Sequence, residues 1–556
     1  MNKKILSGSF WLSFGSIVSR ILGVVYLIPW LIMLGSYHNQ LNAQALFNSS
    51  YTPYALFLSV GTAGLPSVIA REVSQLNSQN RYKDSLYITK LGLIIMLVMG
   101  LACGILLYAT APIIAKNSPV DSVASATISI RVLVPAVIIL PSMSMVRGWF
   151  QGNNDMKPYG ISQLWEQFAR ILFILLATLL VIEVFHHNYV IAVYFSVFGA
   201  CVGAIASHLY LFAYLRKQWG YYKQLLESSE ERALNNVTRS LLNLWYASIP
   251  FVLLGSFITV TQLVDQLLFK QVLINFNHLT SSYVSYIYTI FSANPSKITT
   301  VIISLATAVS ETSLPLLAGL KFENKNRQES IKKLLLENYR LLLFVLLPVV
   351  ASGVFAASPI YTVLFSHDSL GAYYLVENIV QSLLAGLVMN SLTLLLALNM
   401  NKLAVIYIVW GIVFKVILQV PMTMFMNADG AILSTDISFL IVIWLSYHKL
   451  NKTYSIRLTS LLPIVVTNEI YVVILFIYQL LIGNHFNHLG RVGSLIYLAI
   501  FGLVFLGLYI LIANLMGISQ DILAKKSVID IIVISIMNRK SSRTTCCFFS
   551  SFNSCN

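Results

Sequence analysis

An arginine stands in the middle of an apolar stretch near the start of the chain. Arg20 lies about 13 residues into the stretch 8–34, which corresponds to roughly 20 Å along a helix. An ionised side chain at such a depth costs free energy unless a partner or water compensates it, so it usually serves a function. Two roles fit Arg20: it binds a phosphate group of a substrate, or it forms a structural ion pair.

A carboxylate and a guanidinium are spaced four residues apart in another apolar stretch, 158–184. Side chains at this spacing share one face of a helix and can form an ion pair. Glu166 and Arg170 therefore either neutralise each other as a structural pair or line a cavity or a gate. In the second case Arg170 binds substrate, and Glu166 takes part in ion coupling or gating.

Four more ionisable residues lie within apolar stretches or at their ends. The further candidates for substrate binding are Arg71 and Lys297, which follows a predicted Asn-Pro helix break. Arg71 stands near the end of its stretch, where membrane orientation explains a cation as well as substrate binding does. The further candidates for ion coupling or gating are Asp265 and Glu311, since acidic groups inside a membrane commonly bind protons or cations.

Three later ionisable residues, Lys415, Asp436 and Glu469, are expected to pair across helices. The chain has no nucleotide-binding glycine loop and no paired histidines for a metal. Its five cysteines show no metal-ligand spacing and no disulfide framework. We therefore expect no cofactor, no metal and no catalytic residue, and direct coupling to ATP is not indicated.

The amino-acid composition indicates which kind of structure positions these charged residues. Of the 556 residues, 57% are hydrophobic and only 10% are charged, whereas a soluble globular protein has about 25% charged residues. Apolar stretches of about 20 residues, the length that crosses the hydrocarbon of a bilayer, follow one another along the whole sequence. These features predict an all-α polytopic membrane protein.

About fourteen transmembrane helices are predicted. They form two lobes of six helices, followed by two additional C-terminal helices. The predicted spans are 8–34, 44–70, 86–115, 123–148, 158–184, 189–215, 241–269, 294–318, 334–365, 373–398, 403–425, 428–448, 459–482 and 492–516.

The basic residues of the loops predict the orientation. Lys and Arg collect in cytoplasmic loops near helix ends. Here the two termini and the even-numbered loops hold most cations, such as Arg147 and Lys217, whereas the odd-numbered loops hold mainly Lys116, Lys270 and Arg491. Both termini are therefore expected in the cytoplasm. The net charge of +15 is spread over one membrane face, where it meets anionic lipids, and it does not indicate nucleic-acid binding.

Two short patterns recur in the two halves of the chain at nearly the same offset. Leu65-Pro66 recurs as Leu314-Pro315, and the polar segment 153–157 resembles 399–402. Such matches indicate duplication of a six-helix unit, with a substrate path between the two copies; chance is the alternative, because both patterns are common.

This organisation predicts five parts along the chain. They are an N-terminal lobe at 1–217, a cytoplasmic connector at 218–240, a C-terminal lobe at 241–450, two additional helices at 451–517 and a disordered cytoplasmic tail at 518–556.

One motif carries a resemblance to a known family. The segment 147–158 reads Arg-Gly-Trp-Phe-Gln-Gly-Asn-Asn-Asp-Met-Lys-Pro, and it is accompanied by Gly64-Leu65-Pro66 and by Asp265-Gln266. Together these segments resemble the bacterial polysaccharide-type exporters of the sporulation-protein and lipid II flippase group. That group belongs to the multidrug/oligosaccharidyl-lipid/polysaccharide superfamily.

The resemblance implies a carrier in the bacterial cytoplasmic membrane, whose two lobes alternate between inward-open and outward-open forms. It further implies a lipid-linked cell-wall precursor as cargo, similar to lipid II. The implied partners are this lipid-linked oligosaccharide, membrane lipids and proteins of cell-wall synthesis. The relatives are expected to use several cavity arginines, and this chain offers Arg20 plainly but only Lys297 at the start of the eighth helix.

Other classes of protein compete with this interpretation. A flippase for teichoic-acid, capsule or exopolysaccharide units fits the same features with a different sugar. A drug or cation antiporter of the same superfamily shares the fold, although the mid-membrane Arg20 favours an anionic cargo. A membrane enzyme is disfavoured because the longest loop, about 216–240, holds no cluster of catalytic residues. A structural scaffold leaves the intramembrane charges unexplained.

Overall fold

The chain folds entirely into helices and short connections across the described ranges, as the composition predicts. The structure, a computed structural model, describes residues 15, 18–62, 64–230, 237–319, 327–456, 458–486 and 489–518. The predicted tail, 518–556, lies outside the described residues except for Ile518.

The N-terminal half begins with a short apolar helix, Val18–Met33, whose second part is α2. Prolines at the start of several of these helices preset the backbone for the first turn. The helices are α2 (Leu27–Met33), α3 (Tyr37–Thr62), α4 (Leu65–Ser78), α5 (Tyr82–Asn117), α6 (Val123–Val132), α7 (Val134–Gly152), α8 (Lys157–Leu179) with a π-helical turn at Leu180–Val184, and α9 (Tyr189–Glu227).

The C-terminal half contains the remaining helices, and α16 consists of two helices joined at a sharp kink. They are α10 (Val237–Asn275), α11 (Ser281–Tyr288) with a π-helical turn at Thr289–Ala293, α12 (Pro295–Gly319), α13 (Arg327–Phe355), α14 (Ala357–Phe365), α15 (Ser369–Ala397), α16 (Asn401–Tyr454), the 3-10 turns Leu458–Leu461 and Gly483–Phe486, α17 (Leu462–Leu481) and α18 (Arg491–Leu515).

The number of membrane crossings remains a prediction. Ten of the described helices are long and apolar enough to cross a membrane. The long helix α16 accounts for two of the predicted spans, 403–425 and 428–448, which meet at Asn427, where φ is 52° and ψ is −125°. The helices α9 and α10 also run further than expected, so both enter the range 218–240 that the sequence assigns to a connector.

The predicted second span, 44–70, is not one helix but two. Gly64 separates α3 from α4 with a φ of 79°, a left-handed conformation that glycine adopts without steric cost. A Cβ atom at this position would lie 2.9 Å from the carbonyl oxygen of Ser248 on α10. The glycine therefore allows both the bend and the close approach of the two halves.

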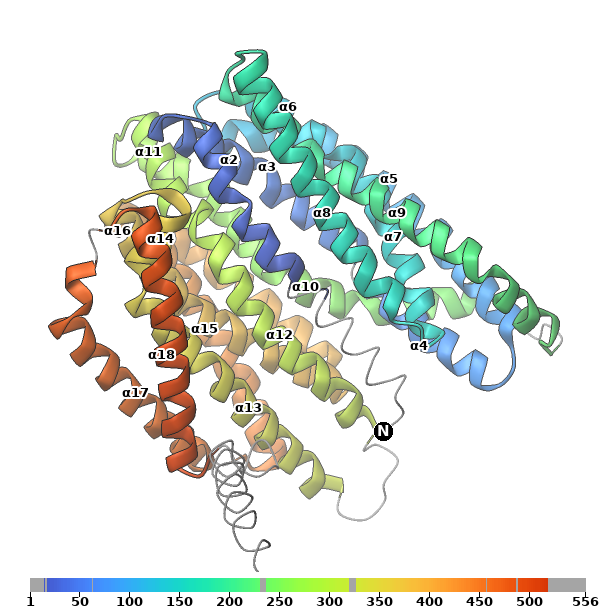
Figure 1. Cartoon of the computed structure of the whole chain (residues 1–556). Coiled ribbons are helices and arrows are strands. Elements are labelled where there is room, and N and C mark those ends of the chain that lie inside the picture. Colours follow the sequence, from blue (N-terminus) through green and yellow to red (C-terminus); the bar gives the residue numbers. More distant parts are fainter. Residues whose placement is uncertain are drawn as a thin grey trace, which may run out of the picture.

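The two halves form two helical bundles that lie at an angle to each other (Figure 1). They meet where α11 contacts α3 and where α14 contacts α2, and α10 contacts α3 and α5 in addition to its main partner α16. The helices α17 and α18 pack against α13 and α14 at the edge of the C-terminal bundle. The interface between the bundles therefore involves mainly α2, α3, α4 and α5 of the N-terminal half and α10, α11 and α14 of the C-terminal half.

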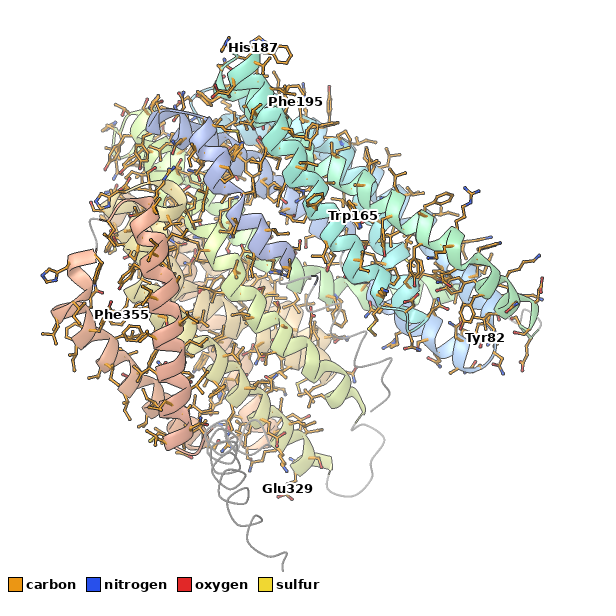
Figure 2. The ribbon with its side chains drawn as sticks, in the orientation of Figure 1. Tyr82, Trp165, His187, Phe195, Glu329 and Phe355 are labelled. Atoms are coloured by element: carbon orange, nitrogen blue, oxygen red, sulfur yellow. The ribbon has the colours of Figure 1, made fainter. Side chains whose placement is uncertain are left out.

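The outer faces of the bundles are apolar. Trp165 on α8 and Phe195 on α9 project away from the N-terminal bundle (Figure 2), and they are 48% and 42% exposed. On α18, Leu503 is 77% exposed. A water-soluble protein rarely presents so much contiguous apolar surface, whereas lipid tails cover it at no cost. The structure thus agrees with a multi-pass membrane protein.

Candidate functional site

Glu166 lies between two arginines in the N-terminal bundle. Its carboxylate accepts a hydrogen bond from Nη2 of Arg147 at 2.9 Å and another from Nη2 of Arg170 at 3.3 Å. All three side chains are largely buried, with exposed fractions of 9% for Arg147, 17% for Glu166 and 14% for Arg170. The pair expected from the sequence is therefore part of a triad with one surplus positive charge.

Arg147 is the member of this triad that the sequence does not reveal. Its Nε donates to Ser162 Oγ at 2.8 Å, and its Nη2 also donates to Ser207 Oγ at 3.0 Å. The expected position of Arg147 in a loop is wrong, because α7 continues to Gly152 and the chain reverses only near Asn154, where φ is 58°. The sequence nevertheless contains a signal for a buried cation next to α8, because Ser162 and Glu166, two of its hydrogen-bond acceptors, are four residues apart and share one face of this helix.

Tyr51 on α3 connects Arg170 with a cation of the other bundle. The Nη1 atom of Arg170 donates to the Tyr51 hydroxyl at 3.2 Å. The Nζ atom of Lys297, on α12, lies 5.7 Å from the centroid of the Tyr51 ring and 5.0 Å from that of Phe47. Both distances are typical of cation–π contacts. Among the described residues no carboxylate lies within 4.0 Å of the Lys297 ammonium group.

Arg20 also contacts α12 from the N-terminal half. Its Nη1 atom donates to the backbone oxygen of Thr300 at 3.3 Å. An electrostatic attraction links Arg20 to Glu311, three turns further along α12. Arg20 therefore lies at the interface between the bundles with most of its five N–H donors uncommitted within the described part of the chain.

These contacts follow a polar stripe on α12. The members of the stripe are spaced three or four residues apart, which places them on one face of the helix over about 21 Å. They are Lys297, Thr300, Ser304, Thr307 and Glu311. All five are partly or fully exposed, whereas Ile302, Ala306 and Ser310 on the opposite face are buried. The stripe therefore faces away from its own bundle.

We refer to Arg20, Arg147, Arg170, Lys297, Glu166 and Glu311 as the inter-lobe cluster. It contains four cations and two carboxylates, so its net charge is +2 when all groups are ionised. The structure brings together five of the predicted site residues and adds Arg147. Such an arrangement can bind an anion that carries two or more negative charges, because guanidinium groups and ammonium groups both hydrogen-bond to phosphate oxygens.

Asp265 lies elsewhere, inside the C-terminal bundle. Its Oδ1 accepts a hydrogen bond of 2.6 Å from Nζ of Lys415 on α16. Lys415 is fully buried, and Asp265 is 9% exposed. Of the other two late residues, Asp436 is half-buried near Lys415, and Glu469 is exposed on α17. The structure thus separates Asp265 from the inter-lobe cluster.

Arg71 is also apart from the cluster. Its side chain is 74% exposed on α4, and its nearest acidic partner is Glu72, at 3.7 Å. A role of Arg71 in substrate binding stays a prediction. Within the described ranges no group of three or more His, Cys, Asp or Glu side chains is placed to hold a metal ion.

Comparisons with known proteins agree on the family. Residues 5–321 match the model of the family described as "Polysaccharide biosynthesis protein". The chain is 30% identical to "Lipid II flippase MurJ" of Bacillus subtilis (strain 168) over 541 residues, which cover 95% of this chain and 98% of that protein.

Two further similarities support the same relationship. The chain is 24% identical to "Stage V sporulation protein B" of Bacillus subtilis (strain 168) over 247 residues, covering 44% of this chain and 45% of that protein. The fold resembles the solved structure "Lipid II flippase MurJ, inward closed conformation" with a TM-score of 0.63 and 16% identity, covering 92% of this chain and 99% of that one.

Proposed function

Since the chain belongs to the polysaccharide biosynthesis protein family, in the multidrug/oligosaccharidyl-lipid/polysaccharide flippase superfamily, we propose that it moves a lipid-linked cell-wall precursor from the inner to the outer leaflet of the bacterial cytoplasmic membrane. The cargo is a sugar attached to an undecaprenyl-pyrophosphate-like lipid, with a lipid II-like molecule as the specific proposal. The relationship to a curated lipid II flippase over nearly the whole chain supports this assignment.

The observation that carries the proposal is the positive charge of the inter-lobe cluster. A pyrophosphate sugar head cannot enter hydrocarbon without a large desolvation cost. Arg20 and Arg170 from one lobe and Lys297 from the other reach the same interface, and Arg20 and Lys297 have no carboxylate within 4.0 Å among the described residues. Together they can replace the water that solvates the two phosphates.

The same charge argues against the nearer rival, an exporter of cationic drugs. A surplus of two positive charges at the interface repels a cationic cargo. It does not distinguish lipid II from other lipid-linked units, because capsule, exopolysaccharide and teichoic-acid precursors also carry phosphate. These units therefore remain the second candidate cargo.

Hydrogen bonds between the lobes support an alternating-access cycle. Tyr37 donates to Asp368 at 2.6 Å, and Gln271 donates to Asn117 at 3.0 Å. These bonds lie near loops that the distribution of basic residues places outside the cell. We infer that this conformer is closed toward the outside, and that these bonds break when the carrier opens outward.

The test replaces the wild-type gene by variants in cells depleted of the native protein and measures lipid II accessible at the outer leaflet. The variant Arg20→Ala removes one cation of the cluster. The matched control Arg216→Ala removes an exposed arginine in the C-terminal third of α9. We expect Arg20→Ala to lose most of the outer-leaflet lipid II at normal surface expression, while Arg216→Ala behaves as wild type.

Two results separate the cargo candidates. If depletion leaves outer-leaflet lipid II unchanged in a strain that lacks other flippases, the lipid II proposal is wrong. If depletion instead abolishes a capsule or teichoic-acid polymer, the precursor of that polymer replaces lipid II as the proposed cargo. Equal effects of the two arginine variants would remove the phosphate-binding role from Arg20.

A further inference from the structure

Lys415 has an unusual surrounding for an ammonium group inside a membrane protein. The residue is fully buried in α16. Its Nζ lies within hydrogen-bond distance of four oxygen atoms: Asp265 Oδ1 at 2.6 Å, Thr435 Oγ1 at 2.6 Å, Ser434 Oγ at 2.9 Å and the backbone oxygen of Ala431 at 3.0 Å. An ammonium group has three N–H donors, so there is one oxygen more than it has protons to share.

The two hydroxyl groups direct their lone pairs to the centre of this oxygen cage. The Ser434 hydroxyl has two acceptors of its own, Gln419 Oε1 and the backbone oxygen of Ala431, both at 2.8 Å. The Thr435 hydroxyl has the backbone oxygen of Ala431 at 3.2 Å. The Ser434 proton therefore has a partner outside the cage, Gln419, and the Thr435 proton goes to the backbone oxygen of Ala431, so neither hydroxyl needs Lys415 as an acceptor. One carboxylate, one carbonyl and two hydroxyl oxygens are ligands that hard metal cations prefer.

The backbone around the cage explains how two segments supply these ligands to the lysine of a third. Asn427 breaks α16, and the second half of the helix folds back along the first half that carries Lys415. Ala431, Ser434 and Thr435 lie in the first turns after this break, and Asp265 comes from α10. In membrane carriers, discontinuous helices commonly provide the carbonyl oxygens of cation sites.

The local charge favours a cation at this place. Asp436 is half-buried, is attracted electrostatically to Lys415, and has one carboxylate oxygen, Oδ1, with no hydrogen-bond partner among the described residues. The carboxylates of Asp265 and Asp436 therefore both lie near one ammonium group, although only Asp265 forms an ion pair with it. Without Lys415 they would form an uncompensated negative site in a medium of low polarity, which is costly unless another cation enters.

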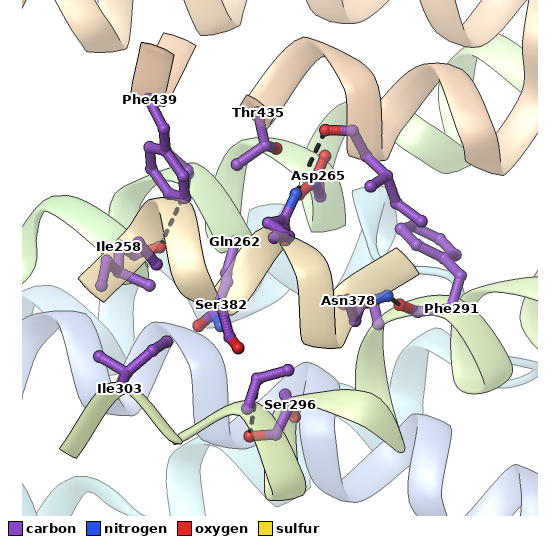
Figure 3. A pocket seen from close by; sticks show the side chains of 16 residues that line it. Ile258, Gln262, Asp265, Phe291, Ser296, Ile303, Asn378, Ser382, Thr435 and Phe439 are labelled. Carbon is purple, nitrogen blue, oxygen red and sulfur yellow. Dashed lines mark hydrogen bonds between the residues drawn. The ribbon is translucent and has the colours of Figure 1, made fainter. Parts of the chain in front are cut away.

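A small cavity adjoins the cage. Its volume is about 40 Å³, and its lining includes Asp265, Thr435, Gln262 and Asn378. Asp265 and Thr435 lie next to each other in this cavity (Figure 3). The volume accommodates roughly two or three water molecules. An ion that entered the cage could thus keep part of its hydration.

We propose that the Lys415 ammonium group is a built-in substitute for a bound alkali-metal cation, and that the oxygen cage accepts such a cation when the lysine side chain is removed. The ligand class is a single monovalent metal ion, held by Asp265, Ala431, Ser434 and Thr435. Lys415 cannot dissociate, so the C-terminal lobe keeps its cation through every conformation. One consequence rests on the proposed flippase function: transport by the native chain needs no gradient of this metal ion.

The experiment measures thermal unfolding of the purified full-length protein in detergent, at constant ionic strength, in lithium, sodium, potassium or choline chloride. Lys415→Ala opens the cage, and Lys402→Ala, an exposed lysine on the same helix, is the matched control. We expect Lys415→Ala to gain several degrees in Tm in at least one alkali salt over choline, with saturation as the ion concentration rises. Wild type and Lys402→Ala should show no such preference.

A third variant tests the location of the ion. In Asp265→Asn/Lys415→Ala the cage has lost its carboxylate, so the salt preference should disappear. The proposal is overturned if wild type is itself stabilised by one particular alkali cation, or if Lys415→Ala responds equally to all salts or folds in none. Because the readout is stability and not transport, these outcomes leave the proposed function untouched, and a failed lipid II assay leaves this inference untouched.

Discussion

Each lobe contains a group of buried charges, and the two groups differ in how the charges are balanced. In the N-terminal lobe, one carboxylate, Glu166, serves Arg147 and Arg170, and the surplus charge lies toward α12 of the other lobe. In the C-terminal lobe, Lys415 is fully enclosed by oxygen atoms of its own lobe. The N-terminal group leaves positive charge available to a ligand, whereas the ammonium group of Lys415 has no free side from which a ligand could reach it.

This difference indicates two roles for charged side chains inside a membrane protein: binding of a substrate and stabilisation of the fold. A cluster that faces the partner lobe and keeps a surplus charge can exchange its solvation for contacts with substrate, and its geometry can change during a transport cycle. An enclosed and satisfied group cannot contact a substrate, so its effect is on the stability and uniqueness of its own lobe. Mutations should therefore affect stability most in the C-terminal lobe and substrate binding most at the interface.

The largest effect is expected for Asp265→Asn, which leaves the ammonium group of Lys415 without its carboxylate. Removing one partner of a buried ion pair typically costs about 3–5 kcal/mol of unfolding free energy. Chemical unfolding in detergent measures this loss of unfolding free energy, and Asp121→Asn, at an exposed aspartate, is the control. The double variant Asp265→Asn/Lys415→Met, in which no charge is left unpaired, should be less destabilised than Asp265→Asn. A loss below about 1 kcal/mol would contradict the enclosed character of this group.

A smaller loss is expected for Glu166→Gln in the N-terminal lobe. Arg147 keeps Ser162 and Ser207, Arg170 keeps Tyr51, and glutamine retains one hydrogen-bond acceptor. The loss of charged hydrogen bonds should cost about 1.5–3 kcal/mol. The same unfolding assay applies, and the exposed Glu183→Gln is the control. A larger loss of unfolding free energy for Glu166→Gln than for Asp265→Asn would contradict the expectation that the buried charges of the C-terminal lobe matter more for stability.

The sequence predicts the parts of this picture that depend on local patterns. Within the described residues, each predicted span from 8–34 to 492–516 coincides with at least one helix, because a bilayer requires about 20 apolar residues per crossing wherever they lie. The spacing of Glu166 and Arg170 likewise predicts their pairing, because four residues return a helix to the same face. The break at Gly64 was missed, because glycine occurs in membrane helices without ending them.

Contacts between distant segments could not be predicted in this way. Asp265 and Lys415 are on α10 and α16, and no local spacing relates them. The sequence counts Arg147 as a loop cation because it stands near the end of an apolar stretch, and only the packing of α7 on α8 and α9 shows that Glu166 and Ser207 enclose it. The contact of Lys297 with Tyr51 requires the relative placement of the two lobes.

A moderate effect on binding, with little effect on stability, is expected for Lys297→Met. Methionine keeps an apolar chain against Phe47 and Tyr51 but removes the cation that faces the interface. Loss of one charged contact to a phosphate should weaken binding of a short-chain lipid pyrophosphate about tenfold, or about 1.4 kcal/mol. Equilibrium binding to the purified protein measures this change. Lys402→Met is the control, and unchanged affinity for Lys297→Met would exclude this lysine from the site.

The smallest effect is expected for Arg71→Ala, which tests a residue that the sequence proposes for substrate binding and the structure places elsewhere. Its side chain is 74% exposed, and its ion pair with Glu72, at 3.7 Å, is of the surface type that contributes roughly 0–1 kcal/mol. We expect unfolding free energy within about 0.5 kcal/mol of wild type and outer-leaflet lipid II at the wild-type level. If Arg71→Ala instead abolishes transport as Arg20→Ala should, at normal expression, the substrate must also contact the exposed face of α4. The substrate path would then extend from the inter-lobe cluster to α4, and the surplus positive charge at the interface would no longer be enough to identify the binding residues.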